Sequence, residues 1–281
     1  MAQAVLHYLN DRWVTEPDLV VPAQDISILR GYGVFDFLRT YHHKPFKLKE
    51  HLARLAHSAK LVGLTLPMPI SRIEDLVWEG LQKNKETYQD FNIRLVITGG
   101  LSQDSVTPGR STFIIIFTPA VEYPTNFYEK GVKVTTFETM RQLTAAKSTN
   151  YLMGVIALQE ARQVGGVEAI FTSGGQVYEG TTSNIFFGKG NLLITPNFDI
   201  LPGITRNVVL ELARKAGIAV EERPVPVAEL PSCDEAFITA SNKEVMPVVQ
   251  IDDLKVGDGS VGPLSKQLID CYRDLIRDSS K

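Results

Sequence analysis

The chain has 281 residues, of which 44% are hydrophobic and 22% are charged. This length allows two domains or one large domain with a sizeable core, and the composition is typical of a globular protein. The formal net charge of −3, without any basic stripe, argues against a nucleic-acid partner.

The cysteines and the apolar runs indicate the cellular environment that we expect. Cys233 and Cys271 are far apart and have no CxxC spacing, so the sequence predicts neither a metal site nor a disulfide framework. The first residues lack a signal peptide's basic start, and no stretch reaches the roughly 18 apolar residues of a membrane span. We therefore expect a protein of the reducing cytoplasm.

Strand and helix patterns alternate over residues 1–120, where we expect a small N-terminal domain. Asn10-Asp11 is typical of a hairpin turn, and Gly31 and Gly33 suit a tight turn before a strand. Ser71 and Glu74 resemble a capping box that opens a helix. The predicted strands are residues 4–9, 12–14, 34–41, 45–48, 92–98 and 111–119, and the predicted helices are residues 49–62 and 71–82.

A stretch with two prolines, residues 119–131, suits a connector, which we place at residues 121–130. Residues 131–281 then form a larger domain. Its predicted strands are residues 132–137, 169–172, 176–179, 184–187, 192–195, 220–225, 235–240 and 246–251, and its predicted helices are 150–163, 205–216 and 263–277. The expected fold class is α+β, with mixed sheets in both halves.

Lys147 lies among small residues in TAAKSTNYL, and no other charged residue falls between Arg141 and Glu160. Tyr151 brings a phenol close to it in sequence. Desolvation favours the neutral amine, which is the nucleophilic form needed for a Schiff base. The alternative is a surface lysine where a loop meets a helix.

The stretch LPGITRNVVLELARKAG, residues 201–217, combines a Pro202-Gly203 turn with an amphipathic helix that opens at Thr205. The start of a helix offers free N–H groups and a positive dipole end, and Gly203 lets the backbone approach a ligand. Such a turn can hold a phosphate. The alternative is a capped helix with no ligand.

Two further features are open to a binding role. TASNKEV, residues 239–245, offers hydroxyl and amide groups, or is a polar loop. Arg54 lies beside an apolar helix face, which often marks a charged ligand. An ion pair with Glu50, four residues earlier, is the alternative for Arg54.

The motifs HLARL, KSTNYL, YEGTTSNIFF and LPGITR occur in this order with suitable gaps. Together they resemble the class IV aminotransferases, the fold type IV enzymes that use pyridoxal phosphate, and the resemblance covers essentially the whole chain. That family includes branched-chain aminotransferases, D-amino-acid transaminases, (R)-amine transaminases and 4-amino-4-deoxychorismate lyase. The resemblance implies a small N-terminal α/β domain, a larger β-rich C-terminal α/β domain with the cofactor between them, and a homodimer that shares active-site loops.

The resemblance also implies residue roles. Lys147 would hold pyridoxal 5'-phosphate as an internal aldimine and move the proton of the substrate. Glu179 would face the pyridine nitrogen and keep it protonated, and Tyr151 would bond the 3-oxygen of the ring. The phosphate would be bound by Arg54, the backbone N–H groups of Ile204 and Thr205, and the turn that contains Ser241 and Asn242.

Which family member this chain resembles depends on its arginines. VFDF at residues 34–37 and the sequence around Arg94 depart from the branched-chain pattern. The loop of residues 99–110 lacks the arginine and histidine of the well-studied D-amino-acid group, with Arg110 at its far end. Arg30 and Arg94 resemble a less common set of D-amino-acid transaminases, in which such arginines bind the substrate carboxylate. A surface turn and a cross-strand ion pair are their alternatives.

We therefore predict a transaminase that moves an amino group from a D-amino acid such as D-alanine or D-glutamate to a 2-oxo acid such as 2-oxoglutarate. A branched-chain L-amino-acid aminotransferase is the first alternative and 4-amino-4-deoxychorismate lyase is the second, although Asn150-Tyr151-Leu152 fits transaminases better. Tyr32 and Phe35, with Phe37 and Met246, are candidates for the side-chain pocket or for the core. Whether Arg30 serves its own active site or that of a partner stays open.

Overall fold

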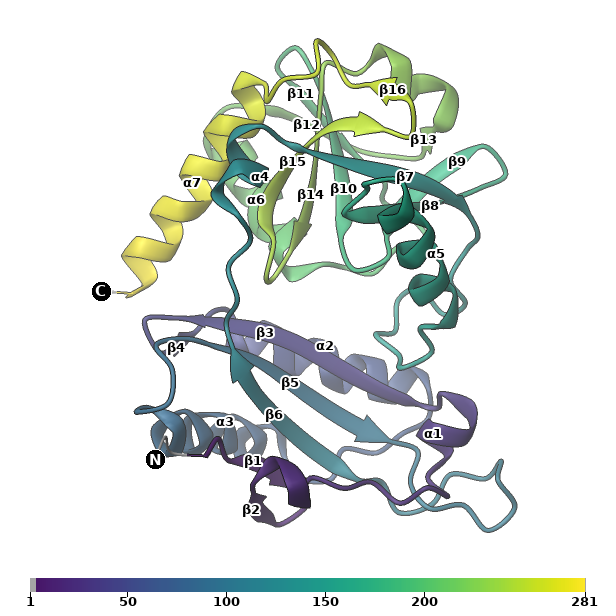
Figure 1. Cartoon of the computed structure of the whole chain (residues 1–281), viewed down its shortest axis with the longest axis vertical. Helices are drawn as coiled ribbons and strands as arrows, with labels where there is room; N and C mark the ends of the chain where they lie inside the picture. Colours follow the sequence, from purple (N-terminus) through teal and green to yellow (C-terminus); the bar gives the residue numbers. More distant parts are fainter. Residues whose placement is uncertain (1–3, 281) are drawn as a thin grey trace. The chain divides into compact units, whose positions relative to one another are not determined.

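The computed structural model describes residues 4–280, and these form two compact units (Figure 1). Unit 1 contains the chain as far as Val121 together with the segment Ala146–Tyr151, and unit 2 contains Glu122–Ala145 and Leu152–Ser279. The change of unit after Val121 lies at the start of the expected connector. Lys147 therefore packs with the N-terminal residues, whereas the sequence had placed it in the C-terminal domain.

Unit 1 is built on a six-stranded sheet in the order β2-β1-β6-β5-β3-β4. Each pairing is antiparallel, so the expectation of a mixed sheet in this half was wrong. Antiparallel strands can be joined by short turns, and the chain uses one at Asn10-Asp11. The strands are β1 (His7–Leu9), β2 (Arg12–Val14), β3 (Gly33–Tyr41), β4 (Lys44–Pro45), β5 (Phe91–Thr98) and β6 (Phe113–Pro119).

Two amphipathic helices, α2 (Leu48–Leu61) and α3 (Ile70–Asn84), cover one face of this sheet. Leu52 and Leu55 of α2 pack with Val34 and Leu38 of β3 in one buried cluster. Side chains alternate along a strand, so Asp36 shares the face of Val34 and Leu38 that meets the helices. Strand β3 thus presents one carboxylate to α2.

Two local predictions in unit 1 were wrong, and one short helix was not predicted. Residues 45–48 are not a strand beyond Pro45, because helix α2 already begins at Leu48. Ser71 does not cap α3, which begins at Ile70 after Pro69 without a side-chain cap. A short helix that the sequence did not predict, α1 (Ile26–Arg30), is capped by Asp25 and ends at Gly31 with φ +65°. A 3-10 turn, η1, spans Glu16–Asp18.

Unit 2 contains a ten-stranded mixed sheet in the order β12-β11-β10-β14-β15-β7-β8-β9-β13, with β16 paired to β15. β7 is parallel to both β15 and β8, and β11 is parallel to β12, whereas the other pairings are antiparallel. The strands are β7 (Val132–Glu138), β8 (Glu168–Ser173), β9 (Gln176–Gly180), β10 (Asn184–Lys189), β11 (Leu192–Thr195), β12 (Ala219–Glu222), β13 (Val225–Pro226), β14 (Glu235–Ala240), β15 (Glu244–Ile251) and β16 (Leu254–Lys255).

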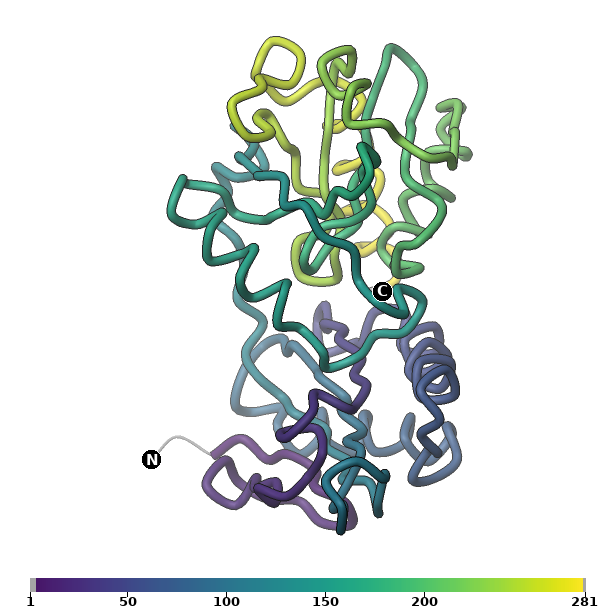
Figure 2. Tube along the Cα trace, turned by 90° about the vertical axis from the view of Figure 1, so that its right-hand side faces the viewer, coloured from purple at the N-terminus to yellow at the C-terminus, as the bar shows by residue number. Residues whose placement is uncertain are grey.

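The helices of unit 2 are α4 (Thr125–Glu129), α5 (Leu152–Gln163), α6 (Ile204–Lys215) and α7 (Pro263–Ser280), with a 3-10 segment η2 (Val227–Ser232). Their course along the chain can be followed in Figure 2. Small residues Ala157 and Ala161 let α5 pack closely on Phe171 of β8. Met246 is fully buried in the main core of unit 2, which agrees with its core alternative. Across the described part of the chain, no helix is both long and apolar enough to cross a membrane.

Candidate active site

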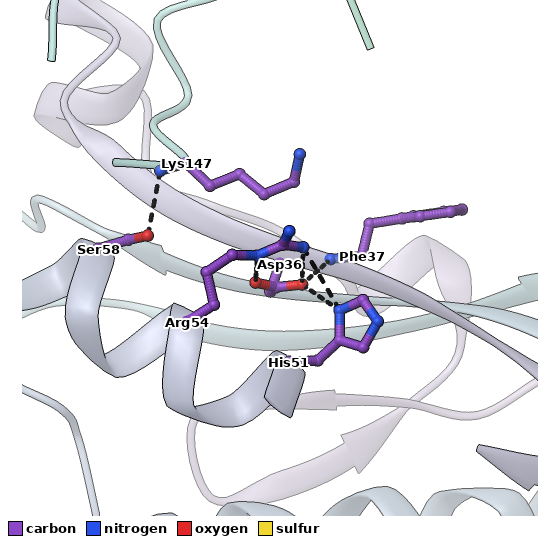
Figure 3. Close-up of polar contacts among 6 residues, drawn as sticks. All are labelled: Asp36, Phe37, His51, Arg54, Ser58 and Lys147. Atoms are coloured by element: carbon purple, nitrogen blue, oxygen red, sulfur yellow. Dashed lines mark hydrogen bonds and ion pairs between the residues drawn. The ribbon is translucent and has the colours of Figure 1, made fainter. Parts of the chain in front are cut away.

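Lys147 is fixed to unit 1 through its backbone. Its N–H donates to Oγ of Ser58 at 3.0 Å (Figure 3). Its carbonyl accepts from the N–H of Phe35 at 2.9 Å. The next residue, Ser148, forms an antiparallel bridge with Val34 at the start of β3. The backbone of the lysine is therefore held at both sides, while its side chain points away from Ser58 (Figure 3).

The amine of Lys147 lies against one aromatic ring, and a second ring packs on the first. Its Nζ lies 4.7 Å from the centre of the Phe35 ring, and Tyr151 meets the same ring edge-on with the ring centres 5.7 Å apart. The guanidinium carbon of Arg94 lies 5.8 Å from Phe35 and 5.7 Å from Phe37. Two cations and three aromatic rings thus gather on the face of β3 that points away from its helices.

A buried carboxylate holds Arg54 in place. Asp36 accepts from Nε of Arg54 at 2.8 Å and from Nη2 at 2.9 Å, and Nδ1 of His51 lies 2.6 Å from the same carboxylate (Figure 3). Glu50, the partner considered from helical spacing, pairs instead with Lys47 at 3.1 Å. Arg54 therefore pairs across the α2–β3 contact rather than along its own helix.

The charges of this cluster follow from its burial. Burial alone would raise the pKa of Asp36, but Arg54 and the hydrogen-bonded His51 outweigh it and hold that pKa well below its usual range. Burial lowers the pKa of His51 more than the neighbouring Asp36 raises it. At neutral pH His51 is therefore uncharged and donates through Nδ1 to an ionised Asp36. The two parallel bonds to Asp36 fix the plane of the Arg54 guanidinium.

In unit 2, Glu179 is a buried carboxylate at the end of β9. Its Oε1 accepts from Nη1 of Arg141 at 2.7 Å, and its Oε2 accepts from the N–H of Leu201 at 2.8 Å. Sequence reasoning missed Arg141, because no local spacing connects it to Glu179. These two donors fix the position of the carboxylate.

The loop that starts at Leu201 leads into α6, whose first residue is Ile204. No side chain caps this helix, and its N-cap is Gly203. A Cβ on Gly203 would lie 1.9 Å from Oδ1 of Asn184, whose amide donates to the carbonyl of Leu201 at 3.0 Å. The approach of Asn184 explains the glycine, and the first backbone N–H groups of α6, including those of Ile204 and Thr205, suit an anion.

The remaining predicted site residues lie in turns and at an exposed helix end. Ser241 and Asn242 are half-buried in the turn between β14 and β15. Arg30 is exposed at the end of α1, where its guanidinium donates to the carbonyl of Leu29 at 2.9 Å. The hydroxyl of Tyr32 donates to the carbonyl of Val62, and its ring packs on the core of unit 1. The substrate roles of Arg30 and Tyr32 stay predictions.

The chain is similar in sequence to named enzymes over nearly its whole length. Residues 33–251 match the family model described as amino-transferase class IV. A putative branched-chain-amino-acid aminotransferase of Methanocaldococcus jannaschii is 37% identical over 276 residues, which are 95% of each chain. A D-alanine aminotransferase of Bacillus licheniformis is 33% identical over 264 residues, which are 92% of this chain and 93% of that relative.

Solved structures confirm the predicted fold class. The branched-chain amino acid aminotransferase of Escherichia coli superposes with a TM-score of 0.91 at 30% identity, over 98% of this chain and 95% of that chain. A second branched-chain amino acid aminotransferase, from T.th., was solved with pyridoxamine 5'-phosphate and gives a TM-score of 0.90 at 26% identity, with the same coverage of 98% and 95%.

Proposed function

The chain belongs to the class IV aminotransferase family, and from this membership we propose that it uses pyridoxal 5'-phosphate, bound through Lys147, to move an amino group from an amino acid to a 2-oxo acid. The observation that carries this proposal is Lys147 itself. Its backbone is bonded on both sides, and its amine lies against the aromatic ring of Phe35. A lysine amine held in this way is the group that forms a Schiff base with an aldehyde.

The residues present fit the parts of this cofactor. The amine of Lys147 suits its aldehyde, and the buried carboxylate of Glu179 suits a protonated ring nitrogen. The start of α6 and the guanidinium of Arg54 suit its phosphate. Ser241 and Asn242 offer further hydroxyl and amide groups for the phosphate or for the substrate carboxylate.

When bound, pyridoxal phosphate withdraws electrons from the α-carbon of the substrate and carries the amino group between the two half-reactions. Nζ of Lys147 would take the proton from that α-carbon and deliver it to C4′, the aldehyde carbon of the cofactor. Glu179, held in place by Arg141, would keep a proton on the ring nitrogen. The hydroxyl of Tyr151 would donate to the ring 3-oxygen.

The test of this function is the absorption spectrum of the purified full-length protein after addition of pyridoxal phosphate. We expect a band near the edge of the visible range that is absent from Lys147→Ala. Lys60→Ala, an exposed lysine of α2, serves as the control and keeps the band. A wild-type protein that shows no such band after reconstitution refutes the proposal.

We further propose that the amino donor is a D-amino acid such as D-alanine or D-glutamate, with 2-oxoglutarate as an acceptor. The resemblance of Arg30 and Arg94 to those of certain D-amino-acid transaminases supports this substrate class, and the guanidinium of Arg94 and the amine of Lys147 lie against the same ring of Phe35. A planar guanidinium can bind the α-carboxylate of a substrate through two parallel hydrogen bonds. Arg30 is a second candidate for this carboxylate, in its own active site or in that of a partner.

A branched-chain L-amino acid is the alternative substrate. The similarity to a putative branched-chain enzyme at 37% identity favours it, and Phe35 and Phe37 give an apolar surface that an aliphatic side chain could contact. The named relatives are aminotransferases, which favours amino transfer over the lyase reaction of the same family.

Single-substrate half-reactions separate the two alternatives. D-alanine and L-leucine are each added to the protein with bound cofactor, and the loss of the visible band is followed. We expect D-alanine to bleach the band and Arg94→Ala to raise the KM for D-alanine by about tenfold or more, as for a lost hydrogen bond to a charge. Arg110→Ala, exposed in the loop of residues 99–110, is the control. Bleaching by L-leucine alone contradicts the D-amino-acid proposal.

We also propose a cytoplasmic homodimer that shares active-site loops. Leu152, Met153 and Val155 of α5 support a protein contact, because they expose 68%, 42% and 50% of their surface. Light scattering of the purified protein is the measurement, and a monomer at micromolar concentration contradicts the dimer.

A further inference from the structure

Glu168, the first residue of β8, is a fully buried carboxylate that the function proposed above does not use. Oγ1 of Thr182 donates to it at 2.8 Å and Oγ of Ser183 donates at 3.2 Å. Oγ1 of Thr181 and the N–H of Thr182 also donate to it. All three hydroxyls of the turn that follows Glu179 therefore bond one carboxylate, which suits an ionised group that accepts and does not donate.

Lys243 completes this cluster from the turn between β14 and β15, which also contains Ser241 and Asn242. Its side chain is 6% exposed, and its Nζ donates to Oε2 of Glu168 at 2.7 Å and to Oγ1 of Thr182. Its carbonyl accepts from the hydroxyl of Tyr128 in α4 at 3.2 Å. The residue that directly follows Ser241 and Asn242 is thus fixed at its amine and at its backbone.

The turn after Glu179 has little freedom of its own. The N–H of Gly180 donates to the carbonyl of Ser183 at 2.7 Å, and a Cβ on Gly180 would lie 2.2 Å from Oγ of Ser183. A larger residue in place of Gly180 would therefore displace the Ser183 hydroxyl, which bonds Glu168. A shift of Glu168 would move this turn, and with it the end of β9 that presents Glu179.

We propose that the buried Glu168–Lys243 ion pair is a positioning element that joins the turn of residues 180–183 to the turn of residues 240–243. It sets the separation between the carboxylate of Glu179 and the polar groups of Ser241 and Asn242. The inference rests on the proposed function, in which Glu179 serves the ring nitrogen and the second turn serves the phosphate. Groups that hold the binding residues in position affect the affinity for a ligand without touching the ligand.

The test compares Lys243→Met with Arg223→Met, which breaks the partly exposed Arg223–Glu229 pair of the same unit. The full-length chain is titrated with pyridoxal phosphate and with pyridoxal, which lacks the phosphate. We expect Lys243→Met to weaken the affinity for pyridoxal phosphate about tenfold or more and the affinity for pyridoxal much less. The ratio of the two affinities therefore falls in Lys243→Met and stays at the wild-type value in Arg223→Met.

A second variant covers the case in which Lys243→Met does not fold, because a buried carboxylate without its partner is strongly unfavourable. Glu168→Gln/Lys243→Met removes both charges, and we expect the same fall in the affinity ratio. A lower melting temperature with an unchanged ratio means that the pair stabilises the fold alone, which overturns the inference. A wild-type chain that binds neither compound overturns the proposed function and this inference with it.

Discussion

The side chain of Asp36 determines the orientation of its neighbours in unit 1. It accepts two hydrogen bonds from Arg54 and one from His51, and all three residues are largely shielded from water. The sequence suggested Glu50 as the partner of Arg54, because residues four apart are neighbours on a helix. Asp36 is 18 residues from Arg54 and meets it because α2 packs on β3.

The burial of His51 predicts a loss of stability in mild acid. Because burial lowers the pKa of His51, the unfolded chain binds a proton at a higher pH than the folded chain does. The stability that comes from the neutral form is therefore present above the unfolded value of about 6.5 and is lost as pH falls below it. Urea unfolding at pH 7 and pH 5 measures this loss.

We expect His51→Gln to lose less stability than the wild type over this pH interval, by on the order of 1 kcal/mol. His57→Gln, an exposed histidine of the same helix, is the matched control and should follow the wild type. Equal pH dependence in His51→Gln and the wild type would show that His51 contributes nothing to acid sensitivity.

At the scale of elements, helix α6 was predicted from the sequence, but the reason for the glycine before its first residue was not. The sequence predicted a turn and then a helix from Thr205, and the structure begins the helix one residue earlier at Ile204. The reason for Gly203 is not a left-handed backbone, since its φ is −68°. The reason is Asn184 of β10, whose side chain occupies the space that a Cβ would need.

We predict that Gly203→Ala lowers the free energy of unfolding by about 1–3 kcal/mol, as overpacking of a close contact does. The same change should weaken pyridoxal phosphate binding, because Asn184 or the first turn of α6 must move. Asn207→Ala, an exposed position in that first turn, is the control. Wild-type thermal stability in Gly203→Ala would contradict the close approach of Asn184.

At the scale of the whole molecule, each unit has a hydrophobic core of its own. Trp13 and Trp78, the two tryptophans of the chain, lie in unit 1, and Cys233 lies buried in the core of unit 2. Burial raises the pKa of the Cys233 thiol to about 11, so at neutral pH it is almost entirely the unreactive thiol. Tryptophan fluorescence and labelling of Cys233 therefore report on different units.

We predict that the two units unfold in separate transitions, because each buries its own core. The measurement uses Cys271→Ser, which leaves Cys233 as the single thiol, and follows fluorescence and thiol labelling across a urea series. In the absence of urea, labelling of Cys233 should be at least about 100-fold slower than in the unfolded chain. Superimposed transitions would show that the units unfold as one cooperative body.

The sequence by itself determined the family, the fold class and most strands and helices. Periodic apolar residues specify an element wherever it packs, and four motifs in order specify the family even when each is weak. The motifs predicted Lys147 as the nucleophile and Glu179 as the carboxylate for the ring nitrogen, and these roles stay predictions. The D-amino-acid substrate rests on Arg30 and Arg94 and stays a proposal, because these arginines belong to no local pattern that fixes where their side chains lie.

The tertiary structure decided which residues meet. It placed the Lys147 segment with β3, paired Arg54 with Asp36 and Glu179 with Arg141, and joined two turns through Glu168 and Lys243. The three ion pairs among these contacts join residues that lie between 18 and 75 positions apart in the chain. A buried charge takes whichever partner the packing of elements brings within reach, so its partner cannot be found from spacing along one helix or strand.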